Sequence, residues 1–557
     1  MQYNDASQPA SQPASQPASQ PASQPASQPA SPAPVPAPAA LPVDPRFRDW
    51  LTIGFERTLL VVARTETALS RLLDVVSLLE QDRRIQIVFS TDADNPAVFR
   101  AGLDEHLASL RAQLIPWSRA TSTRFDLAVS ASENDNLAEL DASIVLFSHG
   151  LGHQKYYPGS DIVAGLNPAR LEHAEIIALS HEDERAQLPP PAGARAVVVG
   201  DPTLDRLLAG RFRTESYRAA LGASGKPLIV LSSTWGSESL LAKHPDLPER
   251  LVAALPVDEF RVALLLHSGV WSAHGQRQVR AWLSRARELG LLLVEPAGDW
   301  HAVLTAAHCL ISDEGSLALY AAALDLPILL IDDTGAKTVT GSPLAQLAKL
   351  APRFDPSRGD FAAQITAALR DHRPGRWAQA VSGAVTHAEV LRPLLYELLR
   401  LSEPDDAPRM RPVGVPTAAP HRVASMVVGA TADTHILTLR RLPAAPAAPL
   451  PHQHLVADVE LASYRELAAA SVLLTTGAER AAALLAQWPR AEVVATRINE
   501  ASVLLTTRQG VLTASVSQPP PGFDPAILAS CVLIRGREVG KVRIGARVSE
   551  VAVTAAS

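Results

Sequence analysis

Short apolar runs alternate with helical patterns along most of the chain. The run TLLVVAR at 58–64 precedes leucines and valines at three- and four-residue spacing over 68–80, and a second β-rich run, RIQIVFS, occupies 84–90. Buried strands that alternate with amphipathic helices are typical of a parallel sheet with helices on both faces. The pattern therefore predicts a doubly wound α/β domain over 46–210. Its further strands are expected at 125–132, 142–150, 175–181 and 194–201.

A second unit of the same kind begins with the run KPLIVLSSTWG at 226–236. We expect a second Rossmann-like domain over 211–402, facing the first, with a helix near 384–401 that packs back on this two-domain unit. Ligands of open α/β folds bind beside the carboxyl ends of the strands, so a cleft is expected between the two sheets. Its further strands are expected at 260–269, 291–296, 308–316 and 327–333, and its helices at 276–289 and 317–324.

Both ends of the chain have a different character. The tetrapeptide Ser-Gln-Pro-Ala repeats six times from Ser7 to Ala30, which predicts a disordered tail over 1–45 because such a segment cannot offset its own ordering entropy. Five prolines mark 403–420 as a linker. The β-branched runs of 421–557 predict a small α+β domain of unknown role. The heptapeptide ASVLLTT occurs twice within it, which leaves both internal duplication and coincidence open.

Composition excludes several classes of protein. The 557 residues are 19% charged with a net charge of −6, so the chain lacks the general basic surface of non-specific nucleic-acid binders. Two cysteines cannot form a disulfide framework, and we find neither a signal peptide nor an apolar stretch long enough to span a membrane. We therefore expect a cytoplasmic protein without a transmembrane segment, cofactor, metal ion or nucleic-acid partner. Peripheral membrane association and the oligomeric state stay open.

The first candidate for chemistry is the segment SHGLGHQK, directly after an apolar run of the first domain. His149 would lie at the carboxyl end of a parallel strand, where an imidazole that titrates near neutral pH can act as a general base. Gly150 would let the backbone approach a ligand, and Lys155 adds a cation suited to phosphate. The competing interpretation is a strand-end loop whose histidine binds only backbone.

Two strand-end loops of the second domain are the next candidates. Ser233 and Thr234 offer hydroxyls and backbone amides to an anion, although helix capping would explain them equally well. Gly315 and Ser316 stand at the start of an apolar helix, whose free N–H groups and positive dipole end attract a phosphate. An N-cap is again the alternative.

Three more polar residues belong to the same expected edge of the sheet. Asp313 and Glu314 would repel a phosphate placed against them, so we assign them to ribose, base or acceptor hydroxyls. His267 ends an apolar strand and could donate a hydrogen bond to a phosphate oxygen, although a lone histidine in that position is more often structural.

Five segments, taken together, resemble the two-domain GT-B transferases. They are most similar to the CDP-glycerol glycerophosphotransferase-like proteins of actinobacteria, and the resemblance covers roughly residues 55–400. It implies an acceptor-binding first domain and a nucleotide-donor-binding second domain. The segments are SHGLGHQK, VVVGDPTLDRL, VLSSTWG, LLHSGVWSAHG and ISDEGSLALYAAALDLPILL.

The resemblance also implies roles for individual residues. His149 matches the histidine of a His-Gly motif taken as catalytic base, and His267 matches a donor-phosphate ligand in a His-Pro motif whose proline is Ser268 here. The donor loop Thr-Asp-Tyr-Ser-Ser of the family corresponds to 312–316, where Asp313 and Ser316 are kept and Glu314 replaces tyrosine. The implied activity is metal-independent transfer of a glycerophosphate or sugar from a nucleotide-diphosphate donor to a hydroxyl acceptor, in cell-envelope polymer or glycoconjugate synthesis.

Two alternative functions remain open at this point. Nucleotide-sugar 2-epimerases share the fold and a similar Ser-Asp-x-Gly loop, and Asp313, Glu314 and His149 would be the acid/base groups for epimerisation or hydrolysis. A non-catalytic scaffold protein would use the proline-rich tail as a spacer or as a ligand for an aromatic groove.

Overall fold

The computed structural model describes residues 52–556, apart from short segments. The segments that it does not describe are 93–94, 96, 98, 149, 158–159, 297–299, 332–337, 382–387, 407–409, 411, 417–420, 434 and 446–449. The expected tail over 1–45 lies outside the described residues, as does part of the expected linker.

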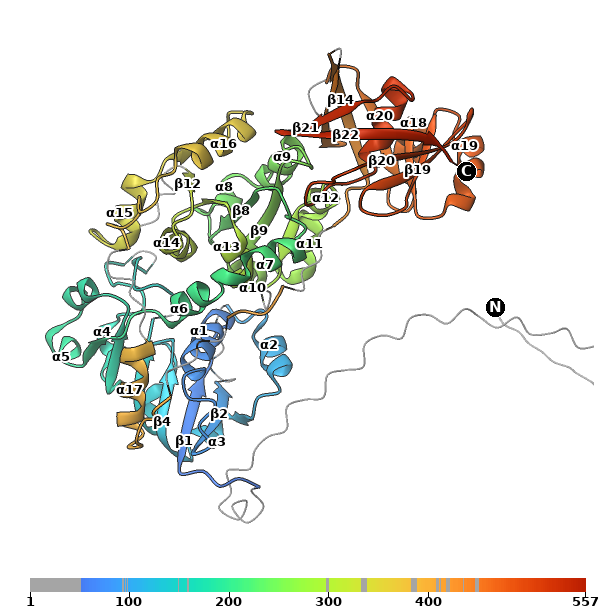
Figure 1. Ribbon diagram of the computed structural model, residues 1–557. Helices are drawn as coiled ribbons and strands as arrows, with labels where there is room; N and C mark the ends of the chain where they lie inside the picture. Colours follow the sequence, from blue (N-terminus) through green and yellow to red (C-terminus); the bar gives the residue numbers. More distant parts are fainter. Residues whose placement is uncertain are drawn as a thin grey trace, which may run out of the picture. The chain divides into compact units, whose positions relative to one another are not determined.

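The first domain contains a seven-stranded parallel sheet with the strand order β3-β2-β1-β4-β5-β6-β7 (Figure 1). Its strands are β1 (Arg57–Val62), β2 (Ile85–Thr91), β3 (Leu114–Pro116), β4 (Arg124–Ser130), β5 (Asp141–Phe147), β6 (Ile176–Leu179) and β7 (Ala196–Val198). Its helical elements are α1 (Glu66–Val76), α2 (Leu103–Leu110), α3 (Trp117–Ala120), η2 (Leu137–Glu139), α4 (Pro168–Leu171), η3 (Glu182–Gln187) and α5 (Pro190–Gly193).

Helices cover both faces of this sheet, as the apolar pattern predicts. Leu59 and Val61 of β1 belong to one buried cluster, whereas the intervening Leu60 and Val62 belong to another. Successive side chains of a strand point to opposite faces, so both faces are buried. Helix α17 (Ala388–Leu398) packs in the cluster of Leu59 through Leu391 and Leu395, although the sequence places these residues with the second domain.

The second domain repeats this architecture in a six-stranded parallel sheet, ordered β10-β9-β8-β11-β12-β13. The strands are β8 (Leu228–Ser233), β9 (Arg261–Leu266), β10 (Leu292–Val294), β11 (Cys309–Ser312), β12 (Ile328–Ile331) and β13 (Arg353–Phe354). The helices that connect or cover them are α6 (Pro202–Ala209), η4 (Arg211–Arg213), α7 (Thr214–Ala220), α8 (Leu240–Lys243), α9 (Leu247–Ala254), α10 (Ser268–His274), α11 (Gln276–Trp282), α12 (Ser284–Glu288), α13 (Trp300–Ala306), α14 (Ser316–Ala323), α15 (Pro343–Leu350) and α16 (Phe361–Asp371). The single helix expected over 276–289 is therefore two helices, which meet at Leu283.

Residues 421–556 form a closed barrel, so the expected α+β domain is not confirmed in that form. The barrel order is β14-β15-β21-β22-β20-β19-β18-β17-β16, and closure rests on pairings between distant segments that the local pattern does not reveal. Apolar side chains and α20 fill its core. The elements are β14 (Ser425–Ala432), β15 (Ile436–Pro443), β16 (His454–Asp458), α18 (Tyr464–Ala469), β17 (Val472–Thr475), η5 (Ala478–Arg480), α19 (Ala481–Gln487), β18 (Val493–Arg497), β19 (Ser502–Thr507), β20 (Gly510–Val516), α20 (Ile527–Arg535), β21 (Lys541–Ile544) and β22 (Arg547–Ala555).

The repeated heptapeptide supplies two strands of this barrel. Its copies form β17 and β19, which pair with opposite edges of β18. The first copy runs parallel to β18 and the second antiparallel, so the copies do not occupy equivalent places. This arrangement favours coincidence over internal duplication.

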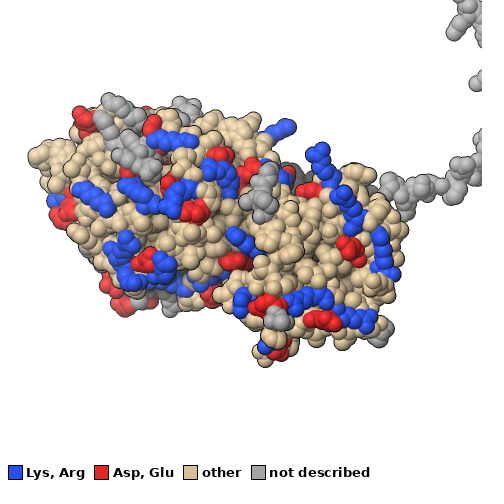
Figure 2. Space-filling model, turned by 90° about the horizontal axis from the view of Figure 1, so that it is seen from above, with Lys and Arg blue, Asp and Glu red and all other residues tan. Residues whose placement is uncertain are grey.

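The charge distribution on the surface and the length of the helices can be compared with the expectations from composition about nucleic-acid binding and membrane spans. Lys/Arg and Asp/Glu side chains are intermingled over the face drawn in Figure 2. Within the described ranges, every helix is too short or too polar to cross a bilayer.

A buried arginine fastens the barrel to the second domain. Arg441 is 2% exposed, and its guanidinium donates to both carboxylate oxygens of Asp258 (2.8 and 2.5 Å) and to Asp524 (2.8 Å). Removing one partner of such a network leaves a buried charge without compensation.

We therefore expect Arg441→Ala to lower the free energy of unfolding of the barrel by about 3–5 kcal/mol. The neighbouring Arg440→Ala is the matched control, since Arg440 is exposed and exposed substitutions usually change stability by less than about 0.5 kcal/mol. Differential scanning calorimetry of both variants checks this, and equal transitions would contradict the role of Arg441.

Candidate active site

The candidate site lies where the strand order of the second sheet reverses. Strands β8 and β11 are neighbours, while the chain leaves β8 toward β9 on one side and leaves β11 toward β12 on the other. The loops after these two strands diverge and leave a crevice at their carboxyl ends. Thr234 follows β8 and Asp313 follows β11, so the sheet itself brings these two sequence-predicted residues together.

The carboxylate of Asp313 clamps the two loops. It is completely buried and accepts hydrogen bonds from the Thr234 N–H (2.9 Å), the Thr234 hydroxyl (2.8 Å) and the Leu240 N–H (2.9 Å). Burial raises the pKa of Asp313, and the hydrogen bonds from Leu240 and Thr234 oppose that shift. The side chain therefore holds the loop after β8 in place.

Glycine is required beside this clamp. A Cβ atom on Gly315 would lie 2.8 Å from Cγ2 of Thr234, well inside van der Waals contact. Gly315 is the N-cap of α14, and among the described residues no side chain caps the amino end of that helix. Ser316 is the first helical residue and is exposed, so the positive end of the helix dipole faces an accessible surface. The first N–H groups of a helix have no partner within the helix itself.

The first domain meets α14 at this end. A Cβ atom on Gly150 would lie 3.4 Å from Cβ of Ser316, so the glycine loop after β5 contacts the helix start directly. His149 precedes Gly150 in the chain and lies outside the described residues. Ser148 accounts for part of the loop geometry, because its hydroxyl donates to the Gly150 carbonyl (2.8 Å).

Lys155 brings a cation to the same place. Burial lowers its pKa, and the nearby carboxylates of Asp313 and Glu314 partly offset that effect. The backbone of Lys155 forms an isolated β-bridge with Thr338 of the second domain. Next to it, Gln154 accepts a hydrogen bond from the Leu344 N–H (3.1 Å) through its side chain and another from the Val339 N–H (2.9 Å) through its backbone. Lys155 is thus held between the domains.

Ser233 and His267 have local roles that sequence reasoning weighed as alternatives. The Ser233 hydroxyl accepts from the Leu241 N–H (3.0 Å). His267 caps α10, because its Nδ1 accepts from the Gly269 N–H (2.9 Å). In a neutral ring this assigns the proton to Nε2, which is then a donor.

A buried network joins the domains behind α14, and sequence reasoning missed it. Asp201 caps α6 and pairs with Arg71 of α1, and it also accepts from the Tyr320 hydroxyl of α14 (3.1 Å). The Asp-Pro-Thr start of α6 is a visible capping signal. Its partners Arg71 and Tyr320 are 130 and 119 residues away, so no local pattern indicates them.

Asp135 and Arg64 form a second unpredicted pair, beside the order reversal of the first sheet. The Asp135 side chain is 1% exposed, and its Oδ2 accepts from the Ser130 hydroxyl (2.6 Å). Its Oδ1 lies 3.7 Å from Nη1 of Arg64 and has no hydrogen-bond partner among the described residues. Burial raises the pKa of Asp135 to about 7, against the Ser130 hydrogen bond and Arg64.

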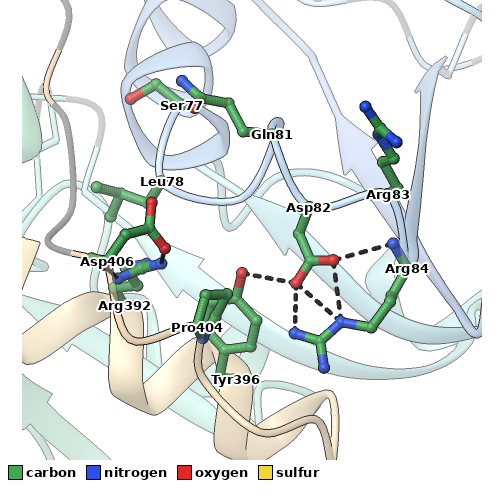
Figure 3. Close-up of a pocket in the computed structure, with 10 residues that line it drawn as sticks. All are labelled: Ser77, Leu78, Gln81, Asp82, Arg83, Arg84, Arg392, Tyr396, Pro404 and Asp406. Carbon is green, nitrogen blue, oxygen red and sulfur yellow. Dashed lines mark hydrogen bonds and ion pairs between the residues drawn. The ribbon is translucent and has the colours of Figure 1, made fainter.

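A cavity of about 390 Å³ lies at the opposite, amino edge of the first sheet (Figure 3). Most of its charged side chains are paired: Asp82 with Arg84 (2.6 Å) and with the Tyr396 hydroxyl (3.0 Å), and Arg392 with Asp406 (3.5 Å). The hydrogen bond from Arg84 lowers the pKa of Asp82 to about 2. The bond between Tyr396 and Asp82 fastens α17 to the first domain, so we assign this cavity a structural role.

Comparisons with known proteins return similar solved structures. No protein-family model and no curated protein matches the sequence. The wall teichoic acid polymerase TagF is similar over 62% of this chain and 89% of its own, at 12% identity and a TM-score of 0.46. The S. aureus MnaA–UDP co-structure is similar over 63% of this chain and 100% of its own, at 14% identity and a TM-score of 0.42. UDP-GlcNAc 2-epimerase from Methanocaldococcus jannaschii is similar over 62% of this chain and 100% of its own, at 13% identity and a TM-score of 0.39. At such values the similarities carry no functional argument.

The raised pKa of Asp135 predicts a pH dependence of stability. An exposed aspartate titrates near 3.9, so between about pH 4 and 7 the folded chain keeps a proton that the unfolded chain has released. The free energy of unfolding should therefore fall as pH rises through this window. Asp135→Asn removes the titration, and we expect it to gain stability relative to wild type between pH 5 and 8. Urea unfolding of wild type and Asp135→Asn at pH 5 and at pH 8 measures this. A difference in the free energy of unfolding between the two proteins that is the same at both pH values would contradict the prediction.

Proposed function

We propose that the chain is a metal-independent GT-B-type transferase that moves a sugar or a glycerophosphate from a nucleotide-diphosphate donor to a hydroxyl acceptor. The product would belong to a cell-envelope polymer or a glycoconjugate. The observation that carries the proposal is the amino end of α14, which no described side chain caps, which exposes Ser316 and which touches Gly150 of the other domain. In this proposal 46–210 binds the acceptor and 211–402 binds the donor.

The amino end of α14 suits the diphosphate of such a donor. Free N–H groups and the helix dipole favour an anion, and the sheet places this helix start at the order reversal, where nucleotides bind in open α/β folds. Lys155 adds a positive charge beside it. A bound phosphate would favour the charged form of Lys155 and thereby reverse the effect of its burial.

The same groups can stabilise the transition state. Transfer leaves negative charge on the departing nucleotide diphosphate, and donors already fixed in place lower the barrier without reorganising. Lys155, the N–H groups of Ser316 and Leu317, and Nε2 of His267 are our candidates for this role. Asp313 would act through the loop that it holds and Glu314 through its charge on Lys155.

The acceptor hydroxyl needs a general base, and we assign this role to His149. The residue precedes Gly150, which contacts the helix start that would hold the diphosphate. A base next to the scissile bond is what in-line transfer to a hydroxyl requires. This assignment rests on chain position and on the resemblance of the His-Gly motif.

Epimerisation or hydrolysis of a nucleotide sugar is the rival reaction. It requires acid and base groups on both faces of the sugar, and Asp313 is one of the few candidates. Both oxygens of Asp313 already accept hydrogen bonds from Thr234, and Oδ2 accepts another from Leu240. This engagement favours transfer. Incubation with UDP-GlcNAc alone separates the two, since an epimer or free UDP formed without acceptor would support the rival.

Two substitutions should separate chemistry from binding. His149→Ala should lower turnover by about 10²–10⁴-fold, as expected for a lost general base, and leave nucleotide affinity unchanged.

Ser316→Pro should weaken UDP or CDP binding by about tenfold or more, because it deletes an N–H donor to a charged group while proline is tolerated at the first helical position. Calorimetry measures affinity, and release of nucleotide from donor plus acceptor measures turnover.

Ser316→Ala is the control for the proline variant, because it keeps the N–H group and removes only the hydroxyl. It should bind nucleotide more tightly than Ser316→Pro. Full turnover of His149→Ala would refute the assigned base. Equal affinities of wild type and Ser316→Pro would refute the phosphate site at α14.

A further inference from the structure

Three rings from both domains meet beside the candidate site. Phe99 follows β2 in the first domain, whereas Trp235 and His267 follow β8 and β9 in the second. The ring centroid of Phe99 is 4.8 Å from that of Trp235 and 5.7 Å from that of His267, and the last two are 6.3 Å apart. We call these three side chains the aromatic cluster.

The backbone around the cluster permits this close packing. A Cβ atom on Gly269 would lie 3.0 Å from Cε1 of Phe99 and 3.1 Å from Nδ1 of His267, so a side chain there would push the rings apart. On the other side, a Cβ atom on Gly236 would meet no atom of the described residues within 4 Å. The cluster is therefore tight toward α10 and open beside Trp235.

Trp235 keeps an accessible surface despite these contacts. It is 42% exposed, although it follows directly on Thr234, whose N–H and hydroxyl the buried Asp313 holds. The indole is thus large, apolar and fixed at its backbone, and it costs little conformational entropy when it binds. An exposed aromatic ring next to polar donors is suited to a ligand with an apolar face and hydroxyl edges.

The place of the cluster decides which part of a donor it would meet. In a nucleotide-diphosphate donor the diphosphate separates the nucleoside from the transferred group. The transferred group must reach the acceptor and base, which the proposed function places in the first domain, and Phe99 belongs to that domain. In this proposal the cluster would therefore meet the transferred group. A pyranose ring offers a flat C–H face to an indole, whereas the three-carbon chain of glycerol offers none.

We propose that Trp235, backed by Phe99, is the platform for the sugar ring of the donor, and hence that the substrate is a nucleotide sugar and not CDP-glycerol. This inference rests on the proposed function and adds the substrate class to it. His267 borders the platform, where Nε2 can donate to a sugar hydroxyl or to a phosphate oxygen.

The test compares the affinity that the sugar adds to the nucleotide. Calorimetry on the full chain would measure UDP, UDP-glucose, UDP-GlcNAc, CDP and CDP-glycerol against wild type, Trp235→Ala, Trp235→Phe and Trp282→Ala. Trp282 is the matched control, since it is a 52% exposed tryptophan of the same domain that contacts His274 instead. Because Trp235 is itself partly exposed, its variants should fold, and melting curves check this.

We expect a UDP-sugar to bind wild type more tightly than UDP. Trp235→Ala should reduce that advantage by about tenfold while leaving UDP affinity unchanged, Trp235→Phe should retain much of it, and Trp282→Ala should retain all of it. The inference is overturned if UDP-sugars gain nothing over UDP, if Trp235→Ala weakens UDP equally, or if CDP-glycerol alone gains over its nucleotide. In those cases nucleotide binding would still support the proposed function. Failure of every compound to bind wild type would overturn both.

Discussion

The candidate site depends on one buried carboxylate. Asp313 joins the loops that leave β8 and β11, and three kinds of contact follow from its position. It fixes Thr234, against which Gly315 packs without room for a side chain. Gly315 in turn is the N-cap of α14, and Trp235 directly follows Thr234 in the chain. The proposed phosphate site and the aromatic cluster therefore share one anchor, and a carboxylate in a low-dielectric surrounding holds such N–H donors strongly.

The second constraint is the joint between the domains. The candidate site includes Gly150 and Lys155 of the first domain as well as the amino end of α14. Behind that helix, Arg71 pairs with Asp201, which also accepts a hydrogen bond from Tyr320 of α14. Because these groups are buried, separating the domains would leave charges without partners. The bridge of Lys155 with Thr338 fastens the other side. The first and second domains thus meet through polar contacts that require a defined geometry.

Much of this could be predicted from local patterns. Apolar runs located eleven of the thirteen strands of the two sheets, and only β3 and β13, with three and two residues, escaped notice. The Gly-Ser start of α14 was visible as a helix terminus. The contacts of Asp313 with Thr234 and of Trp235 with Phe99 could not be predicted from local patterns. The partners are distant in sequence, and the contacts depend on the strand order and on the meeting of the two domains. Closure of the barrel could not be predicted for the same reason, since it requires β14 to pair with β16 and β15 to pair with β21.

A crystal structure of the full chain with UDP or CDP bound tests the central claim most directly. The account predicts the diphosphate against the N–H groups of Ser316 and Leu317, with the Lys155 ammonium within ion-pair distance of a phosphate oxygen. It also predicts the hydrogen bonds of Asp313 to Thr234 unchanged. A nucleotide bound elsewhere, for instance in the cavity beside Arg84 and Arg392, with the amino end of α14 unoccupied, would contradict it.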